Sequence, residues 1–322
     1  MNFKIVNLDP TESISTSKFK IDFMLESEVS ESYNITFKIY DPFFGIMFIP
    51  GEHTINVPTN ACFWVGFEIE PTANEEKPNL KNGFRLVVEL SDTKKVIYDQ
   101  THLTNYKQNR PLEKPIVWII GDSNVWASFG DSSYRPLDIA GYYPMRISCV
   151  SLSLNRLIRG DYMSFINYLP IEENDIIVFY FGEIDYRLNI FNRSKRRNES
   201  VDHLNSQLLI NYKNIIENIK IKYNNKFIIM SPNPPMRDGF LIHLIDGTEE
   251  ERIKLFDDFN KFWSQNKIKG VEYLNWTKKY TSEDNLAKTE LYNHQDHHIL
   301  EYKYCIEELS NSLTRISEVK AI

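Results

Sequence analysis

The fold is decided by the stretch Ile116-Val117-Trp118-Ile119-Ile120-Gly121-Asp122-Ser123. Its first five residues are apolar and mostly β-branched, which predicts a buried strand, and the small polar residues that follow end the strand abruptly. Open α/β sheets bind their ligands beyond the carboxyl ends of the strands. A serine placed there can act as a nucleophile if a base reaches it. The alternative is a simple strand-to-helix turn in which Asp122 or Ser123 is the N-cap.

Downstream of this stretch, strand-like and helix-like runs alternate. The predicted strands lie at residues 116–120, 147–152, 176–181, 227–230 and 271–274. The predicted helices lie at residues 161–167, 201–223, 249–265 and 301–316. Strands that alternate with helices predict parallel pairing, so we expect a three-layer α/β domain with a parallel sheet.

Upstream, the chain reads as a series of short strands separated by turn residues. The predicted strands lie at residues 3–7, 19–24, 33–40, 53–57, 62–69, 84–90 and 95–98. With no helical pattern between them, they predict a β-sandwich. We place this accessory domain at residues 1–107 and the α/β catalytic domain at 108–322, joined by a linker at 105–115. The aromatic stretch 42–48 is interpreted as a buried strand or interdomain contact, or alternatively as a ligand patch.

Composition and charge narrow the range of functions. The chain has 322 residues and a net charge of −7, which argues against non-specific nucleic-acid binding. One basic run, Arg193-Ser194-Lys195-Arg196-Arg197, is interpreted as a solvated loop, with an anionic-ligand contact as the alternative. No secretory leader and no long apolar segment are visible, so no membrane span is expected. Scattered cysteines at 62, 149 and 305 predict buried thiols in a reducing compartment, which favours the cytoplasm.

A second polar segment follows the apolar run 176–180 and reads Gly182-Glu183-Ile184-Asp185-Tyr186-Arg187. Glu183 and Asp185 are candidates to orient a base or to bind a substrate hydroxyl, and Arg187 is a candidate to neutralise one of them. The alternative is an Arg–carboxylate cluster that satisfies itself at the start of a helix.

Three of the seven histidines lie in a third polar segment, Asn293-His294-Gln295-Asp296-His297-His298. Histidine titrates near neutrality and is the usual general base for a serine. A zinc site and a polar surface loop are the alternatives. Neither the HExxH spacing nor a matching cysteine pair accompanies the segment, so we predict no metal and no other cofactor.

Together these three segments resemble the SGNH/GDSL hydrolase superfamily. In that superfamily the serine lies in a Gly-Asp-Ser block after the first strand, a Gly-x-Asn-Asp block follows the central strand, and an Asp-x-x-His block lies near the carboxyl terminus. Ser123, the Gly182 block and the His297-His298 block occur here in the same order. The resemblance covers residues 115–320, and Phe-Gly-Glu-Ile-Asp in the third block is similar to bacterial glycan-associated members. It implies an SGNH-like or flavodoxin-like fold for the α/β domain.

The resemblance also implies an activity and its residues. We expect a serine esterase or acyltransferase acting on O-acyl, and specifically O-acetyl, groups of a carbohydrate. Ser123 is the expected nucleophile, His298 or His297 the expected base, and Asp296 a neighbouring acid. The other expected residues, which line the oxyanion hole or bind substrate, are Gly121, Asp122, Asn124, Asn155, Gly182, Glu183, Asp185 and Arg187. The expected partner is a small-molecule or glycan substrate.

Two departures from the superfamily pattern point to an alternative function. Ile184 stands where the block-three asparagine would donate to the oxyanion hole, a loss typically worth ~3 kcal/mol unless Asn155, Arg187 or backbone N–H groups replace it. No acidic residue lies three positions before His297 or His298, so Asp296, Glu183 or Asp185 would have to orient the imidazole, or the site is a Ser–His dyad. The alternative is a non-catalytic glycan-binding or assembly protein on an SGNH-like scaffold.

Overall fold

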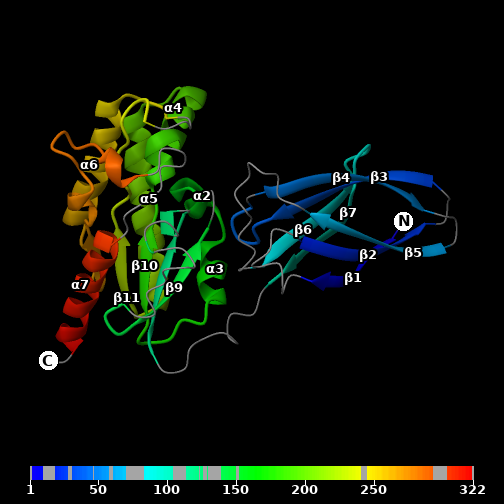
Figure 1. Ribbon diagram of the computed structural model, residues 1–322, viewed down its shortest axis with the longest axis horizontal. Coiled ribbons are helices and arrows are strands. Elements are labelled where there is room, and N and C mark those ends of the chain that lie inside the picture. Colours follow the sequence, from blue (N-terminus) through cyan, green and yellow to red (C-terminus); the bar gives the residue numbers. More distant parts are fainter. Residues whose placement is uncertain are drawn as a thin grey trace. The chain divides into compact units, whose positions relative to one another are not determined.

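A computed structural model describes residues 2–9, 19–27, 31–45, 47–57, 61–69, 83–103, 114–122, 124, 125, 129, 139–149, 152–240, 245–292 and 303–320 (Figure 1). The chain divides into two compact units, Met1–Gln108 and Asn109–Ile322. Most of the expected linker, from 105 to 113, lies outside the described residues.

The first unit contains two antiparallel sheets. One has the order β1-β2-β5, formed by β1 (Asn2–Asp9), β2 (Phe19–Ser27) and β5 (Ala61–Ile69). The other has the order β4-β3-β6-β7, formed by β4 (Met47–Val57), β3 (Glu31–Tyr40), β6 (Phe84–Leu90) and β7 (Val96–His102). Contacts of β4 with β5 and of β1 with β7 join the sheets. The predicted β-sandwich is therefore confirmed.

Strand β3 shows the predicted alternation of buried and solvated positions. Ile35, Phe37 and Ile39 are buried, while the residues between them are partly exposed. Phe37 and Ile39 pair with Val88 and Leu86 of β6, so these side chains share the buried face of the sheet. The aromatic stretch that follows is divided: part of it is a turn between β3 and β4, and Met47 begins β4.

The second unit contains a five-stranded parallel sheet. Its strands are β8 (Ile116–Gly121), β9 (Tyr143–Ser148), β10 (Ile176–Tyr180), β11 (Lys226–Met230) and β12 (Val271–Leu274). Their spatial order is β12-β11-β10-β8-β9, and every neighbouring pair is parallel. Read from β9, the sheet has the chain order 2-1-3-4-5 of the flavodoxin-like fold. The predicted α/β architecture is confirmed.

The second strand of this sheet was predicted at the wrong place. The apolar pattern favoured 147–152, whereas β9 runs from Tyr143 to Ser148 and pairs with β8 from Ile116↔Tyr143 to Gly121↔Ser148. Pro144 reads as a strand breaker in the sequence. In the structure it is tolerated because β9 is an edge strand with only one ladder to satisfy.

Seven helices and helical turns matter for the site and the core. They are α2 (Leu154–Arg159), α3 (Tyr162–Tyr168), the π-helical turn η3 (Asp185–Asn189), α4 (Ile190–Arg197), α5 (Val201–Lys222), α6 (Glu249–Gln265) and α7 (Lys303–Lys320). Two short 3-10 turns, η4 (Thr277–Lys279) and η5 (Thr289–Leu291), follow β12. Helix α6 begins and ends where predicted, and Thr248 and Glu251 form a reciprocal capping box at its start.

The basic run at 193–197 is not a loop, contrary to expectation. It forms most of α4, a helix that continues directly from η3 and buries Ile190 and Phe191. Its later residues, Lys195 to Arg197, are exposed as predicted. The run has little apolar periodicity of its own, so its helix depends on the packing of those two buried residues.

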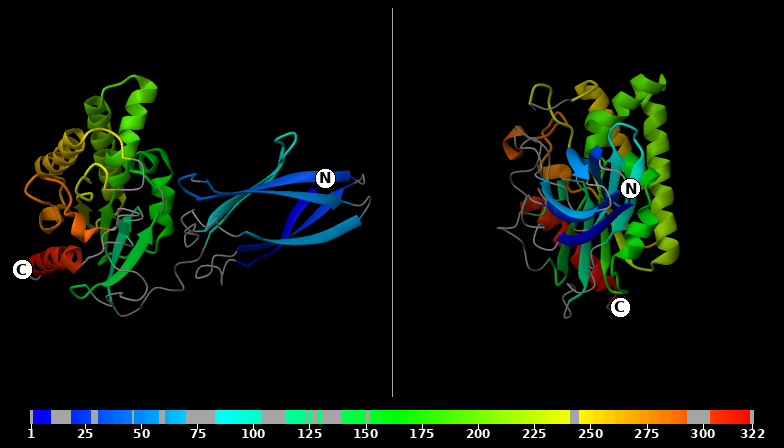
Figure 2. Two further views of the ribbon diagram at one scale, coloured as in Figure 1. Left: turned by 45° about the horizontal axis from the view of Figure 1, so that its top comes forward. Right: turned by 90° about the vertical axis from the view of Figure 1, so that its right-hand side faces the viewer.

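Helices cover both faces of the parallel sheet. One face packs against α7, with Ile119, Val178 and Ile228 in the same buried cluster as Leu309 and Leu313. The opposite face carries Phe179 and Phe227, which stack on each other, and Lys220 of α5 lies over the Phe227 ring. Figure 2 shows α5 as a long helix beside the sheet. The protein is thus three-layered in this unit.

Two of the three cysteines are buried thiols. Cys149 and Cys305 are buried and form no disulfide, as predicted, while Cys62 lies in β5. Among the described helices, none combines the length and apolar character needed to cross a membrane.

Candidate functional site

The candidate site lies where the strand order reverses. Strands β8 and β10 are neighbours in the centre of the sheet, and their crossover connections lead to opposite sides. In sheets of this kind, ligands usually bind beyond the carboxyl ends of the two strands at such a switch point. The Gly121-Asp122 turn follows β8 and the Gly182 block follows β10, so two of the three predicted segments meet here.

Asp122 and Asn124 form a closed turn directly after β8. The Asp122 carboxylate accepts hydrogen bonds from the backbone N–H of Asn124 and from its side-chain amide, both at 2.9 Å. Both residues are buried, with exposed fractions of 4% and 1%. Ser123, the predicted nucleophile between them, lies outside the described residues.

A chain of amide hydrogen bonds connects this turn to two other strands. Asn233, in the segment after β11, donates from its amide to the Asn124 side-chain oxygen at 2.8 Å. The Tyr180 hydroxyl at the end of β10 donates to the Asn233 side-chain oxygen. We call Asp122, Asn124, Asn233 and Tyr180 the amide relay. Each amide has its donor and acceptor sides fixed by its partners, so the relay holds the ends of three strands in one orientation.

Sequence reasoning missed Asn233. The available signal was its position: it follows the predicted strand 227–230 by three residues, at the same sheet edge as the other segments. A rule that collects polar residues after every parallel strand would have included it.

The Gly182 block begins with a backbone that favours glycine. Gly182 has φ of +119°, and the chain then enters η3, a π-helical turn of a kind often found at functional sites. Within the block, Arg187 donates to the Glu183 carboxylate at 2.6 Å, and both side chains are buried. The Arg–carboxylate pairing considered for this segment is therefore present.

The Asp185 carboxylate binds backbone N–H groups at the start of α2. Its carboxylate accepts the backbone N–H groups of Leu154 at 2.5 Å and Asn155 at 3.4 Å. Burial raises the pKa of Asp185 to about 7, and the nearby Glu183 adds to that rise, while the two N–H bonds and the Arg193 guanidinium oppose it. Asp185 therefore fixes Asn155, one of the predicted oxyanion residues, relative to the Gly182 block.

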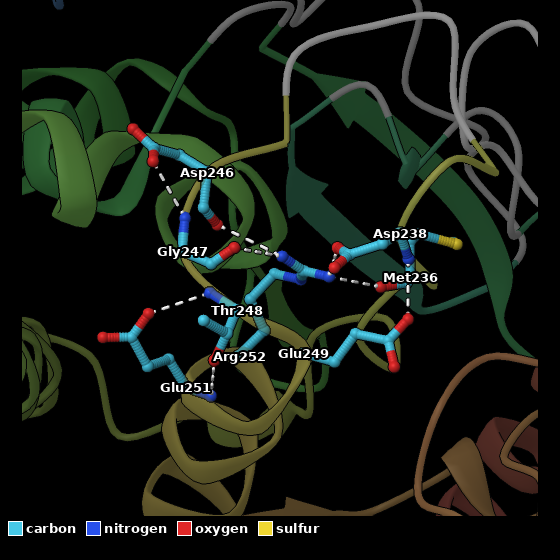
Figure 3. A network of polar contacts seen from close by, with 8 residues as sticks. All are labelled: Met236, Asp238, Asp246, Gly247, Thr248, Glu249, Glu251 and Arg252. Atoms are coloured by element: carbon cyan, nitrogen blue, oxygen red, sulfur yellow. Dashed lines mark hydrogen bonds and ion pairs between the residues drawn. The ribbon is translucent and has the colours of Figure 1, made fainter.

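A buried arginine holds the segment that carries Asn233. Arg252 of α6 is 1% exposed, and its guanidinium donates to the backbone carbonyls of Met236, Asp246 and Gly247 at 3.1, 3.3 and 2.8 Å. It also donates to the Asp238 carboxylate at 2.5 Å (Figure 3). We call this group the Arg252 clamp. It joins the two ends of the segment between β11 and α6.

The clamp is also tied to the Gly182 block. The backbone N–H of Asp246 donates to the carbonyl of Arg187 at 2.9 Å. The segments after β10 and β11 are thus connected through both their side chains and their backbones.

The remaining predicted residues do not enter this geometry. His297, His298 and Asp296 lie outside the described residues, as does His294, so the predicted base and the alternative zinc site are not placed. Within the described part of the chain, no cluster of histidine, cysteine and carboxylate side chains is suited to hold a metal ion.

Gly121 shows why the first block needs glycine. A Cβ at this position would lie 2.1 Å from the carbonyl oxygen of Tyr180 and 2.6 Å from a methyl group of Val125. The close approach of β8 to β10 at the switch point therefore requires a residue without a side chain.

Comparisons with known proteins found similarity to solved structures alone. No protein-family model matches it, and no curated protein matches it. Several solved structures do match the chain. One, described as a candidate platelet activating factor from Streptococcus pneumoniae, is 17% identical with a TM-score of 0.47, over 65% of this chain and 88% of that one. A GDSL-like lipase from Bacteroides thetaiotaomicron is 16% identical with a TM-score of 0.44, over 67% and 97%.

A third match extends over both units. A salicylyl-acyltransferase from a tetracycline biosynthetic pathway is 13% identical with a TM-score of 0.39, over 98% of this chain and 92% of that one. This chain is similar to GDSL-type hydrolases. The matching structures also include an acylhydrolase and an acetyl xylan esterase. The fold assignment itself rests on the 2-1-3-4-5 sheet order.

Proposed function

We propose that this protein is a serine esterase or acyltransferase that acts on O-acyl groups, with Ser123 as its nucleophile. The observation that carries the proposal is the burial of Asp122 and Asn124, the two chain neighbours of Ser123, at the switch point of the sheet. The amide relay holds both of them. A nucleophile needs such a fixed approach to its substrate, and a turn that only connects two elements does not need three strands to hold it.

The proposed reaction has two steps. The Ser123 hydroxyl oxygen attacks the acyl carbonyl carbon while His298, or His297, takes its proton. The tetrahedral intermediate expels the alcohol, which receives that proton, and leaves an acyl-serine. Water, or a hydroxyl group of a second acceptor, then gives its proton to the same histidine and attacks the acyl-serine. The second tetrahedral intermediate then breaks the acyl–serine bond, and Ser123 takes the proton back from the histidine. The product is a carboxylic acid after hydrolysis or a new ester after transfer.

Asn155 is the proposed replacement for the missing oxyanion donor. Ile184 occupies the position of the block-three asparagine, so that block supplies no side-chain amide. Asn155 lies at the start of α2, is partly exposed, and is fixed to the Gly182 block by Asp185. Its side-chain amide and the backbone N–H of Ser123 would together stabilise the oxyanion.

Asp296 is the proposed acid that orients the base. Asp185 accepts two backbone N–H groups, and Glu183 accepts the Arg187 guanidinium. Both carboxylates thus already have structural partners, which leaves Asp296, close in sequence to both histidines, as the acid for this role.

The proposed substrate is an O-acetylated carbohydrate, and the proposed location is the cytoplasm. The proposed chemistry belongs to the α/β unit, which contains the three blocks of the superfamily resemblance, and the β-sandwich unit is proposed as an accessory domain. The superfamily resemblance and the many aromatic residues, 18 Tyr, 20 Phe and 5 Trp, support a sugar substrate.

Hydrolysis of p-nitrophenyl acetate tests the proposal. Ser123→Ala and His298→Ala should each lower kcat/KM by at least about a thousandfold, and Ser164→Ala, an exposed serine on α3, should not. A loss confined to His297→Ala would identify His297 as the base. Equal rates in the wild type and all variants would refute the esterase, as would fluorophosphonate labelling that survives Ser123→Ala.

A non-catalytic glycan-binding protein is the second candidate. It is favoured by the engagement of Glu183 and Asp185 in structural contacts, because neither is then required for catalysis. This candidate predicts that wild type and Ser123→Ala bind an acetylated oligosaccharide equally and that neither releases acetate. Acetate release by the wild type alone would exclude it.

A further inference from the structure

Strand β7 of the β-sandwich unit carries three aromatic or polar side chains on one face. Tyr98, Gln100 and His102 alternate along the strand, so they point to the same side of the sheet. The residues opposite them on β6 are all buried: Val88, Leu86 and Phe84. The three side chains therefore belong to the inner face of the sandwich. Strand β7 ends its sheet in the order of the described strands.

The inner face is open along this edge. Leu86 of β6 is 0% exposed, yet Gln100, which lies directly opposite it on β7, is exposed. Tyr98 and His102, on either side of Gln100, are half-buried. An exposed glutamine next to a fully buried leucine means that the cover of the inner face stops between β6 and β7.

The rings of Tyr98 and His102 form a flat surface along the open edge, which we call the edge wall. The Tyr98 hydroxyl oxygen and His102 Nε2 are 3.2 Å apart, the ring centroids are 6.5 Å apart, and the ring planes differ by 13°. So short a distance between the ring edges, at so large a centroid separation, means that the rings lie edge to edge. Phe84 of β6 stacks on the imidazole, with the centroids 5.1 Å apart. Because β6 is the inward neighbour, the other face of the imidazole points outward from the sheet.

The hydrogen bonds within the edge wall determine which of its polar groups a ligand can use. The Tyr98 hydroxyl donates its single proton to the side-chain oxygen of Gln100 at 2.9 Å. In its contact with Tyr98, His102 Nε2 must therefore be the donor, which makes Nδ1 an acceptor. Burial lowers the pKa of His102, so the imidazole is neutral at neutral pH. The edge wall thus offers the N–H groups of the Gln100 amide as donors and His102 Nδ1 as an acceptor.

The edge wall carries no ionised side chain. The nearest charges on this strand pair lie on the opposite face, where Arg85 and Asp99 form two hydrogen bonds of 2.7 and 2.6 Å with each other. Two coplanar rings with an amide and a neutral imidazole at their rim suit an uncharged ligand that has a flat apolar face and hydroxyl groups around it. A hexose ring has these properties, since its C–H groups form an apolar face and its hydroxyl groups lie at the rim.

We propose that Tyr98, Gln100 and His102 form a binding site for a neutral hexose oligosaccharide on the β-sandwich unit. The C–H face of one sugar ring packs on the edge wall, and the Gln100 amide and His102 Nδ1 bind its hydroxyl groups. All residues assigned to the acyl chemistry belong to the other unit. The inference therefore goes beyond the proposed function and does not depend on it.

Titration calorimetry on the full chain tests this site. The probes are three neutral tetrasaccharides, cellotetraose, β-1,4-mannotetraose and β-1,4-galactotetraose, and the wild type should bind at least one of them. Tyr98→Ala should weaken that binding at least about tenfold, because it removes one of the two rings. Gln100→Ala should weaken it about fivefold, the loss expected for one hydrogen bond.

Thr101→Ala is the matched control, because Thr101 is exposed and points to the other face of the same strand. It should change the affinity by less than about twofold. Circular dichroism identifies the folded variants, and Gln100→Ala, at an exposed position, keeps the test valid if Tyr98→Ala does not fold. Three results would each overturn the site: no binding of any tetrasaccharide by the wild type, an unchanged affinity in a folded Tyr98→Ala or Gln100→Ala protein, or an equal loss in Thr101→Ala and Gln100→Ala.

Two further results separate this inference from its alternatives. Proline-rich peptides also dock on flat aromatic surfaces. Tighter binding of decaproline than of the tetrasaccharides, with the same dependence on Tyr98 and Gln100, would overturn the sugar assignment. Failure of the proposed function has a different signature: a tetrasaccharide binds with the expected dependence on Tyr98 and Gln100, but the wild type does not hydrolyse p-nitrophenyl acetate.

Discussion

Asn124 and Asn233 are 109 residues apart in the chain, and their side-chain amides are joined by a hydrogen bond of 2.8 Å. The bond connects the turn after β8 to the segment after β11, on either side of the central strand β10. Because both amides are buried, neither can exchange its partner for water. The position of the Gly-Asp-Ser turn therefore depends on a residue that lies far away in sequence.

The first prediction concerns Asn233. Asn233→Ala removes the donor to Asn124 and the acceptor for Tyr180, so it should lower the free energy of unfolding by about 1–3 kcal/mol. Asn233→Asp should cost at least as much, because a carboxylate has no N–H to give to Asn124. Urea denaturation measures the change. Asn224→Ala, at an exposed position, is the control and should have little effect.

If the amide relay also positions Ser123, the same Asn233→Ala protein should hydrolyse p-nitrophenyl acetate more slowly at a temperature where it is fully folded. A variant that loses stability but keeps the full rate would show that the relay has only a structural role.

The second prediction concerns the Arg252 clamp. Arg252→Met keeps the side chain's bulk but leaves the carbonyls of Met236, Asp246 and Gly247 without their donor. We expect a loss of about 3 kcal/mol in the free energy of unfolding, measured by urea denaturation. Asp238→Asn should cost less than about 1 kcal/mol, because the Asp238 side chain is 65% exposed. Equal losses would mean that the ion pair, and not the carbonyl contacts, dominates.

Much of the fold was predictable from local pattern. Six of the seven strands of the first unit and helices α5 and α6 are found within a few residues of their predicted places, because alternation and capping residues are local signals. The exception is β4, which was predicted at 53–57 and begins earlier, at Met47. Helix α4 was not predictable, since its polar run becomes helical only through the burial of Ile190 and Phe191. The predicted position of strand β9 was wrong for a similar reason, because only the sheet order shows that Pro144 lies on an edge strand.

The site was predictable in location but not in its contacts. Rules for parallel sheets place the Asp122 and Gly182 segments at the same edge, and the structure does so. These rules do not reveal that the Asp185 carboxylate accepts the Leu154 N–H at the start of α2, because that hydrogen bond joins residues 31 positions apart in sequence. Asn233 was within reach of the same rules, since it follows the predicted strand 227–230, but its bonds to Asn124 and Tyr180 were not.

The third prediction is a pH dependence that originates at Asp185. Its folded-state pKa of about 7 lies above its ordinary value of 3.8, so the folded protein binds this proton more tightly than the unfolded chain does. The proton on Asp185 therefore adds fully to the free energy of unfolding below about pH 4. This addition, on the order of a few kcal/mol, is lost as the pH rises towards 7. Asp185→Asn should remove this part of the pH dependence when unfolding is measured from pH 4 to 8. Asp202→Asn, at an exposed carboxylate, should retain it.

The fourth prediction separates two glycines at the candidate site. Gly182→Ala meets no close contact, since its Cβ would lie 3.6 Å from Pro232, but φ of +119° is unfavourable for alanine. It should fold and lose about 1–3 kcal/mol in the free energy of unfolding.

Gly121→Ala has an ordinary φ, yet its Cβ would lie 2.1 Å from the Tyr180 carbonyl oxygen, so β8 and β10 would have to separate. We expect this variant to show no cooperative unfolding of the α/β unit by circular dichroism. Gly239→Ala, with φ of +73° and open space around it, is the control and should cost about 1 kcal/mol. A stable Gly121→Ala protein would contradict the close strand approach on which the geometry of the candidate site depends.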